Sequence, residues 1–118
     1  MILEGEDLPR IHHVSEKHLQ AVFDEDAEDG FGQFIVMAHE NGGFIQSASM
    51  WELSEECEAF QDRTKSEPYC LEYKDGATGE LFAAEGWFTL KDIKAAFIEY
   101  LRGSNRWRAN KTWKKVEF

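Results

Sequence analysis

The fold is decided by residues 89–103, which read TLKDIKAAFIEYLRG. Thr89 precedes Asp92 by three residues, a spacing typical of a capping box at the start of a helix. Apolar side chains then recur every three or four residues on one face, at Leu90, Ile93, Phe97, Tyr100 and Leu101. Gly103 ends the pattern, because glycine readily adopts the left-handed conformation that terminates helices. The stretch predicts an amphipathic helix that packs against a sheet.

Four segments upstream of this helix have the β-branched and aromatic residues typical of strands. They are Phe34–His39, Phe44–Met50, Tyr69–Tyr73 and Leu81–Ala84. Turn-forming Asn and Gly residues separate the first two segments, and a longer loop with two glycines separates the last two. Both patterns predict hairpins, because Asn and Gly adopt positive φ at low cost. Trp113–Phe118 is a candidate for a final edge strand.

The remaining segments complete the predicted fold. Ser15 can cap a first helix, with Val14 and Leu19 as a hydrophobic staple. Leu53–Phe60 is compatible with either a short helix capped by Ser54 or an irregular loop. We therefore predict an α+β fold, in which an antiparallel or mixed sheet of four to five strands packs against two main helices. Residues 1–118 contain no linker-like composition, so a single domain is expected.

Composition limits the compartment and the cysteine chemistry. The chain has no uninterrupted apolar run of about 18 residues, and its first ten residues carry Glu4, Glu6 and Asp7 where a signal peptide is positively charged. We expect a cytoplasmic protein that does not engage a membrane. Cys57 and Cys70 belong to no CxxC pair, and free thiols are expected in that compartment.

The charge is distributed unevenly along the chain. Residues 1–59 hold 14 acidic and 2 basic residues, a net charge of −12, whereas residues 60–118 hold 9 acidic and 11 basic residues, a net charge of +2. Binding of a nucleic acid depends on neutralising phosphates with Lys and Arg, so direct nucleic-acid binding is not expected. A basic protein is the better partner for the first half.

No residue pattern indicates catalysis or a metal site. The serines lie in no Gly-x-Ser-x-Gly elbow, and the glycines are not followed by the Lys of a phosphate-binding loop. His13 and His18 are five residues apart, a spacing that does not place two imidazoles on one helix face. We expect neither an enzyme nor a metal or cofactor site, although two of the many carboxylates can meet in space as in a glycosidase.

Two acidic clusters and one tryptophan are the candidate binding residues. The proposed set is Asp24, Glu25, Asp26, Glu28 and Asp29 in the first cluster, Glu52, Glu55, Glu56 and Glu58 in the second, and the neighbouring Trp51. Such clusters can simply be solvated faces that keep the protein soluble. Alternatively, they form a docking surface that attracts a basic groove, with Trp51 as an anchor.

The four tryptophans leave a different class of function open. Trp51, Trp87, Trp107 and Trp113 are many for a chain of this length, and exposed Trp side chains can form a sugar-binding platform. Packing in or at the edge of the core is the competing interpretation for each. A small carbohydrate-binding or scaffold module is therefore the alternative to a binder of a basic protein.

Residues 69–113 resemble immunity proteins of bacterial polymorphic toxin systems. The resemblance is carried by LEYKDG at residues 71–76, a strand ending in Phe82, AAFIEYLRG at residues 95–103, and then Trp107 and Trp113. The segment Phe44–Ala48 also resembles the short strand that precedes this block in the family. Residues 51–68 depart from the family pattern, because they are longer and more acidic, and we interpret them as a specificity insertion.

The resemblance implies a cytoplasmic antidote that binds a cognate toxin domain and blocks its active site. Toxins guarded by this family are often deaminases or nucleases, whose substrate grooves are basic. Carboxylates can occupy positions where phosphates would bind, so the acidic first half suits such a groove. The expected partner is a protein toxin domain, and the protein itself is expected to be a monomer or a weak homodimer.

Overall fold

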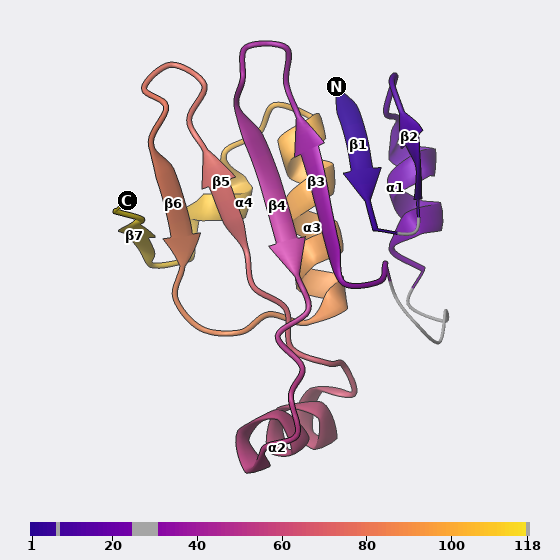
Figure 1. The fold of residues 1–118 in the computed structure, drawn as a ribbon, viewed down its shortest axis with the longest axis vertical. Coiled ribbons are helices and arrows are strands. Elements are labelled where there is room, and N and C mark those ends of the chain that lie inside the picture. Colours follow the sequence, from indigo (N-terminus) through magenta and orange to yellow (C-terminus); the bar gives the residue numbers. More distant parts are fainter. Residues whose placement is uncertain (7, 25–30, 118) are drawn as a thin grey trace.

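The protein is an α+β domain built on one antiparallel sheet. The structure is a computed structural model that describes residues 1–6, 8–24 and 31–117. Within these residues, seven strands lie in the order β2-β1-β3-β4-β5-β6-β7 (Figure 1). The strands are β1 (Ile2–Gly5), β2 (Leu8–Ile11), β3 (Phe34–Ala38), β4 (Phe44–Ala48), β5 (Glu72–Lys74), β6 (Leu81–Ala84) and β7 (Trp113–Lys115). The helices are α1 (Glu16–Val22), α2 (Glu55–Thr64), α3 (Leu90–Leu101) and α4 (Arg106–Ala109).

Helix α3 forms where the sequence predicts it. The Thr89 hydroxyl accepts a hydrogen bond from Asp92 N at 3.1 Å, and the Asp92 carboxylate accepts one from Thr89 N at 3.0 Å. Gly103 follows the last turn with a φ of +78°, a conformation that favours glycine. The buried side chains of Ile93, Ala96 and Phe97 place the apolar face against the sheet.

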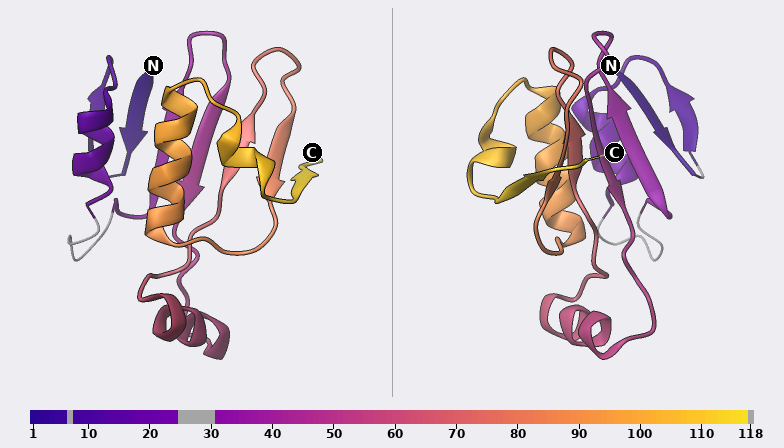
Figure 2. Two further views of the ribbon diagram at one scale, coloured as in Figure 1. Left: turned by 180° about the vertical axis from the view of Figure 1, so that it is seen from behind. Right: turned by 60° about the vertical axis from the view of Figure 1, so that its left-hand side comes forward.

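Helices α1, α3 and α4 cover one face of the sheet (Figure 2). The core between these layers contains fully buried strand residues such as Leu3, Ile35 and Ile45, and the helical residues Leu19 and Phe97. Each strand residue one position away points to the other face, because side chains alternate along a strand. The two main helices of the prediction are thus α1 and α3, to which the structure adds α2 and α4 within the described residues.

The prediction of four to five strands is wrong, because it lacks the N-terminal hairpin of β1 and β2. Strand β1 pairs with β3 in antiparallel register, with Leu3 opposite Met37. Both side chains are 0% exposed, so this pairing belongs to the core. Only four residues form β1 and Pro9 lies in β2, which leaves little local strand signal.

The second face of the sheet has no helix over it in the described part of the chain (Figure 1). Polar and apolar side chains are interspersed on this face, with Val36 and Phe44 beside Gln46, Glu72 and Lys74. Gln46 Nε2 donates a hydrogen bond to Glu72 Oε1 at 3.3 Å, and the Lys74 ammonium lies 6.0 Å from the centre of the Phe44 ring. Most of these side chains are half-buried by their neighbours on the same face, and antiparallel sheets commonly leave one face without a covering layer.

Both edge strands carry features that oppose pairing with another chain. Strand β2 contains Pro9, which has no backbone N–H to donate, and strand β7 contains Lys114 and Lys115. None of the helices in the described ranges combines the length and apolar character needed to cross a membrane.

Candidate functional site

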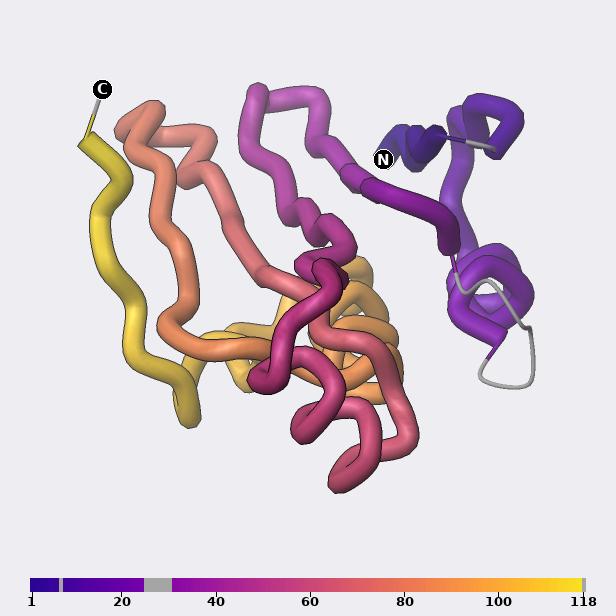
Figure 3. The backbone as a smooth tube through the Cα atoms, turned by 60° about the horizontal axis from the view of Figure 1, so that its bottom comes forward, coloured from indigo at the N-terminus to yellow at the C-terminus, as the bar shows by residue number. Residues whose placement is uncertain are grey.

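An arm extends from one end of the sheet between β4 and β5. We define the arm as residues 50–67, which include α2 and project beyond the strands (Figure 1). Figure 3 shows both of its legs, from β4 out to α2 and from α2 back to β5. At the base, Met50 N donates to Pro68 O at 2.9 Å and Cys70 N donates to Ala48 O at 3.0 Å. The arm is thus a continuation of the β4–β5 pair and is fixed at both legs.

The sequence of the arm favours the helix over the irregular loop. Ser54 is the N-cap, and its hydroxyl accepts a hydrogen bond from Cys57 N at 3.2 Å. Glu55, Glu56 and Glu58 lie in the first turn, where carboxylates interact favourably with the helix dipole. Lys65 closes the helix in the left-handed conformation with a φ of 62°. Of the two structures that the sequence left open for residues 53–60, the helix is the one that forms, and it begins at Glu55.

Two buried side chains hold α2 in place, one by a contact within the arm and one by a contact with the body of the domain. Cys57 is 0% exposed, and its Sγ donates to Met50 O at 3.5 Å. Phe60 is 8% exposed and meets Trp87 edge to face, with ring centres 5.8 Å apart. At the second leg, the Tyr69 hydroxyl donates to Glu67 Oε1 at 2.6 Å, and burial raises the pKa of Tyr69. These contacts hold the arm in one orientation.

The exposed large apolar side chains gather at the arm and its base. In the part of the chain that the structure describes, four such side chains are exposed: Phe34 (47%), Met50 (42%), Trp51 (41%) and Leu53 (89%). Phe34 belongs to this group because it lies opposite Ala48, the residue at which β4 ends before the arm. A concentration of exposed apolar side chains is typical of a protein-binding surface.

The carboxylates of the second acidic cluster lie beside this apolar group. Glu52, Glu55, Glu56 and Glu58 are all exposed. None of them takes part in an ion pair with the residues that the structure describes, and the arm as a whole has six acidic and two basic residues. The arm therefore presents a net charge of −4 together with apolar side chains.

The first acidic cluster lies largely outside the described residues. Asp24 is exposed and follows α1, whereas Glu25, Asp26, Glu28 and Asp29 fall in the undescribed segment. The structure thus brings Trp51 together with the second cluster. Sequence reasoning did not identify Phe34, Met50 and Leu53 as exposed candidate binding residues. For Leu53 a signal was present, because it is an apolar residue between the polar Glu52 and Ser54.

Three cations of the basic C-terminal segment are engaged within the domain. Arg102 forms two hydrogen bonds with the Glu16 carboxylate, at 3.0 and 2.7 Å, and Lys115 pairs with Glu80 at 3.0 Å. Lys111 Nζ donates to Trp107 O at 2.7 Å. Arg102 and Lys115 thus pair with carboxylates of the body, Lys111 bonds to a backbone carbonyl, and none of the three pairs with the acidic side chains of the arm.

Three of the four tryptophans are core or core-edge residues. Trp107 is buried, Trp87 and Trp113 are half-buried, and Trp51 is exposed. Trp107 and Trp113 pack edge to face against Tyr73, each with ring centres 4.9 Å apart. Of the four tryptophans, all within the described residues, Trp51 is the one with an exposed side chain.

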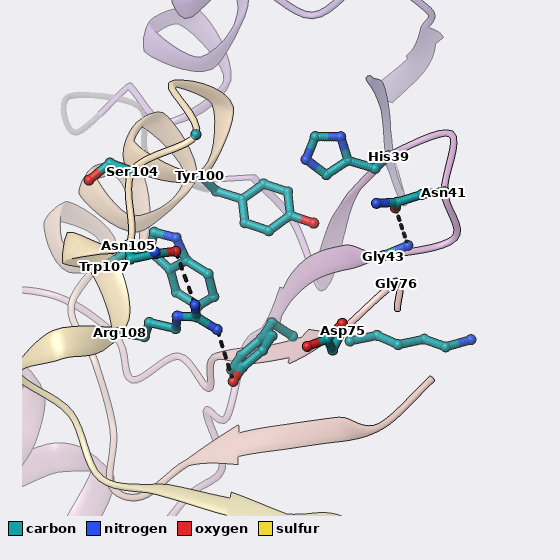
Figure 4. A pocket seen from close by; sticks show the side chains of 13 residues that line it. His39, Asn41, Gly43, Asp75, Gly76, Tyr100, Ser104, Asn105, Trp107 and Arg108 are labelled. Atoms are coloured by element: carbon teal, nitrogen blue, oxygen red, sulfur yellow. Dashed lines mark hydrogen bonds between the residues drawn. The ribbon is translucent and has the colours of Figure 1, made fainter. Parts of the chain in front are cut away.

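A pocket lies at the end of the sheet opposite the arm. The β3–β4 loop, the β5–β6 loop and the α3–α4 connection enclose a cavity of about 230 Å³ (Figure 4). Its lining includes His39, Asp75, Tyr100, Asn105 and Arg108. Sequence reasoning missed this pocket, because its residues come from three distant segments.

Among the described residues, no group of His, Cys, Asp and Glu side chains is arranged to hold a metal ion.

Comparisons with known proteins give no assignment: no family model, no curated protein and no solved structure matches this chain.

Proposed function

We propose that the protein is an immunity protein that neutralises a cognate toxin domain by binding over its active site. The observation that carries the proposal is the arm, where exposed Trp51 and Leu53 stand among four exposed carboxylates on a rigid projection. The resemblance of residues 69–113 to immunity proteins of polymorphic toxin systems supports the same function. The protein acts by occupancy in the cytoplasm of the producing cell and has no catalytic role of its own.

The arm combines the two properties that such binding requires. Its carboxylates attract a basic groove and accelerate the encounter, an effect that weakens as salt screens the charges. Its apolar side chains provide the short-range contact, because buried aromatic anchors contribute most to the stability of protein interfaces. A toxin that acts on nucleic acid has a groove lined with Lys and Arg, and carboxylates of the arm would take the positions of phosphates there.

The shape of the arm supports occlusion of a groove. Helix α2 projects beyond the sheet, so it can enter a concave site while the body of the domain remains outside (Figure 1). The Phe60–Trp87 contact and the Tyr69–Glu67 hydrogen bond fix the arm before binding. A preorganised arm loses less conformational entropy on binding, which favours a long-lived complex.

The proposal predicts that a secreted protein with a toxin domain is encoded beside this chain, and the test uses that toxin domain. We expect co-expression to prevent toxicity and the two purified proteins to form a complex. The double variant Trp51→Ala/Leu53→Ala should weaken the affinity by roughly a hundredfold, as expected for loss of interface anchors. The triple variant Glu52→Gln/Glu55→Gln/Glu56→Gln should slow association by roughly tenfold at low salt and flatten its salt dependence.

A matched triple variant controls for net charge. Glu40, Glu85 and Glu117 are exposed outside the arm, so their replacement by Gln removes the same charge from other surfaces. This control should retain the association rate to within about twofold, because long-range charges are screened at moderate salt. Equal slowing by both triple variants, or no slowing by either, would show that the arm does not steer the partner.

A further inference from the structure

We propose that the pocket opposite the arm binds a small molecule that carries a single carboxylate, held by Arg108 and Tyr100. The cavity of about 230 Å³ is smaller than the roughly 300 Å³ or more that drug-sized ligands occupy, so its ligand is a small organic acid. The site is at the other end of the sheet from the arm, and this proposal does not rest on toxin binding.

Arg108 is held in position by its neighbours but has no anionic partner. Its guanidinium lies 5.5 Å from the ring centres of both Tyr73 and Trp107, and Nη2 donates to Asn105 Oδ1 at 3.0 Å. A weaker contact of 3.4 Å joins Nη1 to the Tyr73 hydroxyl. Within the described ranges no carboxylate pairs with Arg108, in contrast to Arg10 and Arg102.

The guanidinium therefore offers unused donors to the pocket. Arginine has five N–H groups, and the two hydrogen bonds of Arg108 occupy two of them. In Figure 4 the guanidinium lies at one wall of the pocket, between Asn105 and the centre of the cavity. A planar fork of this kind matches the two oxygens of a carboxylate, and such charge-assisted pairs are about twice as strong as neutral ones.

Tyr100 supplies a second donor to the pocket. Its hydroxyl points into the cavity toward His39 in Figure 4, and it forms no hydrogen bond with any residue that the structure describes. Burial and the nearby charge of Asp75 raise the pKa of Tyr100 to about 12. The hydroxyl therefore keeps its proton at neutral pH and can donate to an anionic oxygen.

Asp75 limits the charge that the ligand can carry. Its Oδ1 accepts hydrogen bonds from Ala77 N at 2.8 Å and Thr78 N at 3.4 Å, so the carboxylate is fixed in the wall of the pocket. A second negative charge on the ligand would be repelled by Asp75. Lys74 also lines the cavity, but its ammonium lies 6.0 Å from the centre of the Phe44 ring, which belongs to the sheet face opposite the buried Ile45. A carboxylate monoanion is thus preferred over a phosphate dianion.

Aromatic rings suit the apolar part of such a ligand. Tyr73, Tyr100 and Trp107 line the cavity, and the two tyrosine rings each contact the Trp107 ring edge to face. The Tyr100 ring also lies 5.2 Å from the His39 imidazole. A carboxylate with a small ring, such as benzoate, places its charge at Arg108 and its ring among these side chains.

The experiment is a titration of the intact protein with benzoate, followed by NMR shifts of the pocket residues. Benzamide has the same shape without the charge, and inorganic phosphate supplies a dianion. We expect saturable shifts with benzoate, and weaker binding of benzamide and phosphate by about tenfold or more. No saturable shift up to about 10 mM benzoate, or tighter binding of phosphate or benzamide, would overturn the proposal.

Three variants locate the binding. Arg108→Gln should weaken benzoate by about tenfold or more, and Tyr100→Phe, which keeps the ring, by roughly threefold. Arg106→Gln is the matched control, because Arg106 is exposed in the same helix and does not line the pocket, and it should bind like the wild type. Since Arg108 also packs against two rings, thermal unfolding checks its fold, and Tyr100→Phe tests the site independently. Unchanged affinity in both pocket variants would refute the assignment.

Discussion

Replacing Phe60 by alanine should release the arm without unfolding the domain. Phe60 is 8% exposed, and its main aromatic contact is the edge-to-face pair with Trp87 on the body. The other buried residue of α2 is Cys57, which bonds to Met50 within the arm itself. Phe60 is therefore the principal link between α2 and the domain.

The expected loss is about 3 kcal/mol of local stability. Burial of a phenylalanine side chain stabilises by roughly 1.5–3 kcal/mol, and an edge-to-face aromatic pair adds about 0.5–1.5 kcal/mol. Alanine keeps little of either contribution. A ten-residue helix has marginal stability when it is detached, so α2 should open when its attachment is lost. Because each 1.4 kcal/mol is tenfold, the opening equilibrium should shift by roughly a hundredfold.

Hydrogen exchange of the native protein measures this shift. Amides of α2 should exchange about a hundredfold faster in Phe60→Ala, whereas those of β3 and β4 should be unchanged, because local opening is separate from global unfolding. Leu53→Ala is the matched control on the same arm: the side chain is 89% exposed, and its loss should leave α2 protected. Uniform acceleration across the sheet in Phe60→Ala would refute the view that the arm opens independently.

Two further predictions concern the body of the domain. Leu3→Ala should destabilise the whole protein by about 2–5 kcal/mol in urea unfolding, because Leu3 is fully buried in the core, and a loss below about 1 kcal/mol would contradict an integral N-terminal hairpin. The Arg102 guanidinium, through its hydrogen bonds, lowers the pKa of Glu16 from the usual 4.5. The stabilisation from this pair is therefore complete above pH 4.5 and is lost as the pH falls through the lowered pKa of the folded state. Unfolding curves of wild type and Glu16→Gln should converge at acid pH, and a difference that stays constant with pH would refute the linkage.

Local sequence was sufficient for the elements that depend on neighbouring residues. The capping box of Thr89 and Asp92 and the turn at Asn41 and Gly42 both form as predicted. Ser15 also caps α1, although its partner at the third position is His18, whose Nδ1 accepts from Ser15 N at 3.0 Å. Caps and turns can be predicted from the sequence because their hydrogen bonds join residues within about four positions of each other.

The number of strands in the sheet could not be predicted from local sequence in the same way. Strand β1 is stabilised by pairing with β3, more than 30 positions along the chain, and by burial of Leu3 in the common core. Its four residues carry little strand signal of their own. Pairing between distant segments contributes energy that a local window cannot contain, so four to five strands were predicted where seven form.

By itself, the sequence determined the α+β class, the capped helix α3, the two central hairpins and an acidic segment with Trp51 at its start. The tertiary structure decided that this segment projects from the sheet as an arm, that Phe34 is exposed near its base, and that Arg108 and Tyr100 line one pocket with residues of two distant loops. The physical reason is that periodicity, capping and charge are properties of short stretches. Solvent exposure and the meeting of distant side chains depend on how all of the elements pack together.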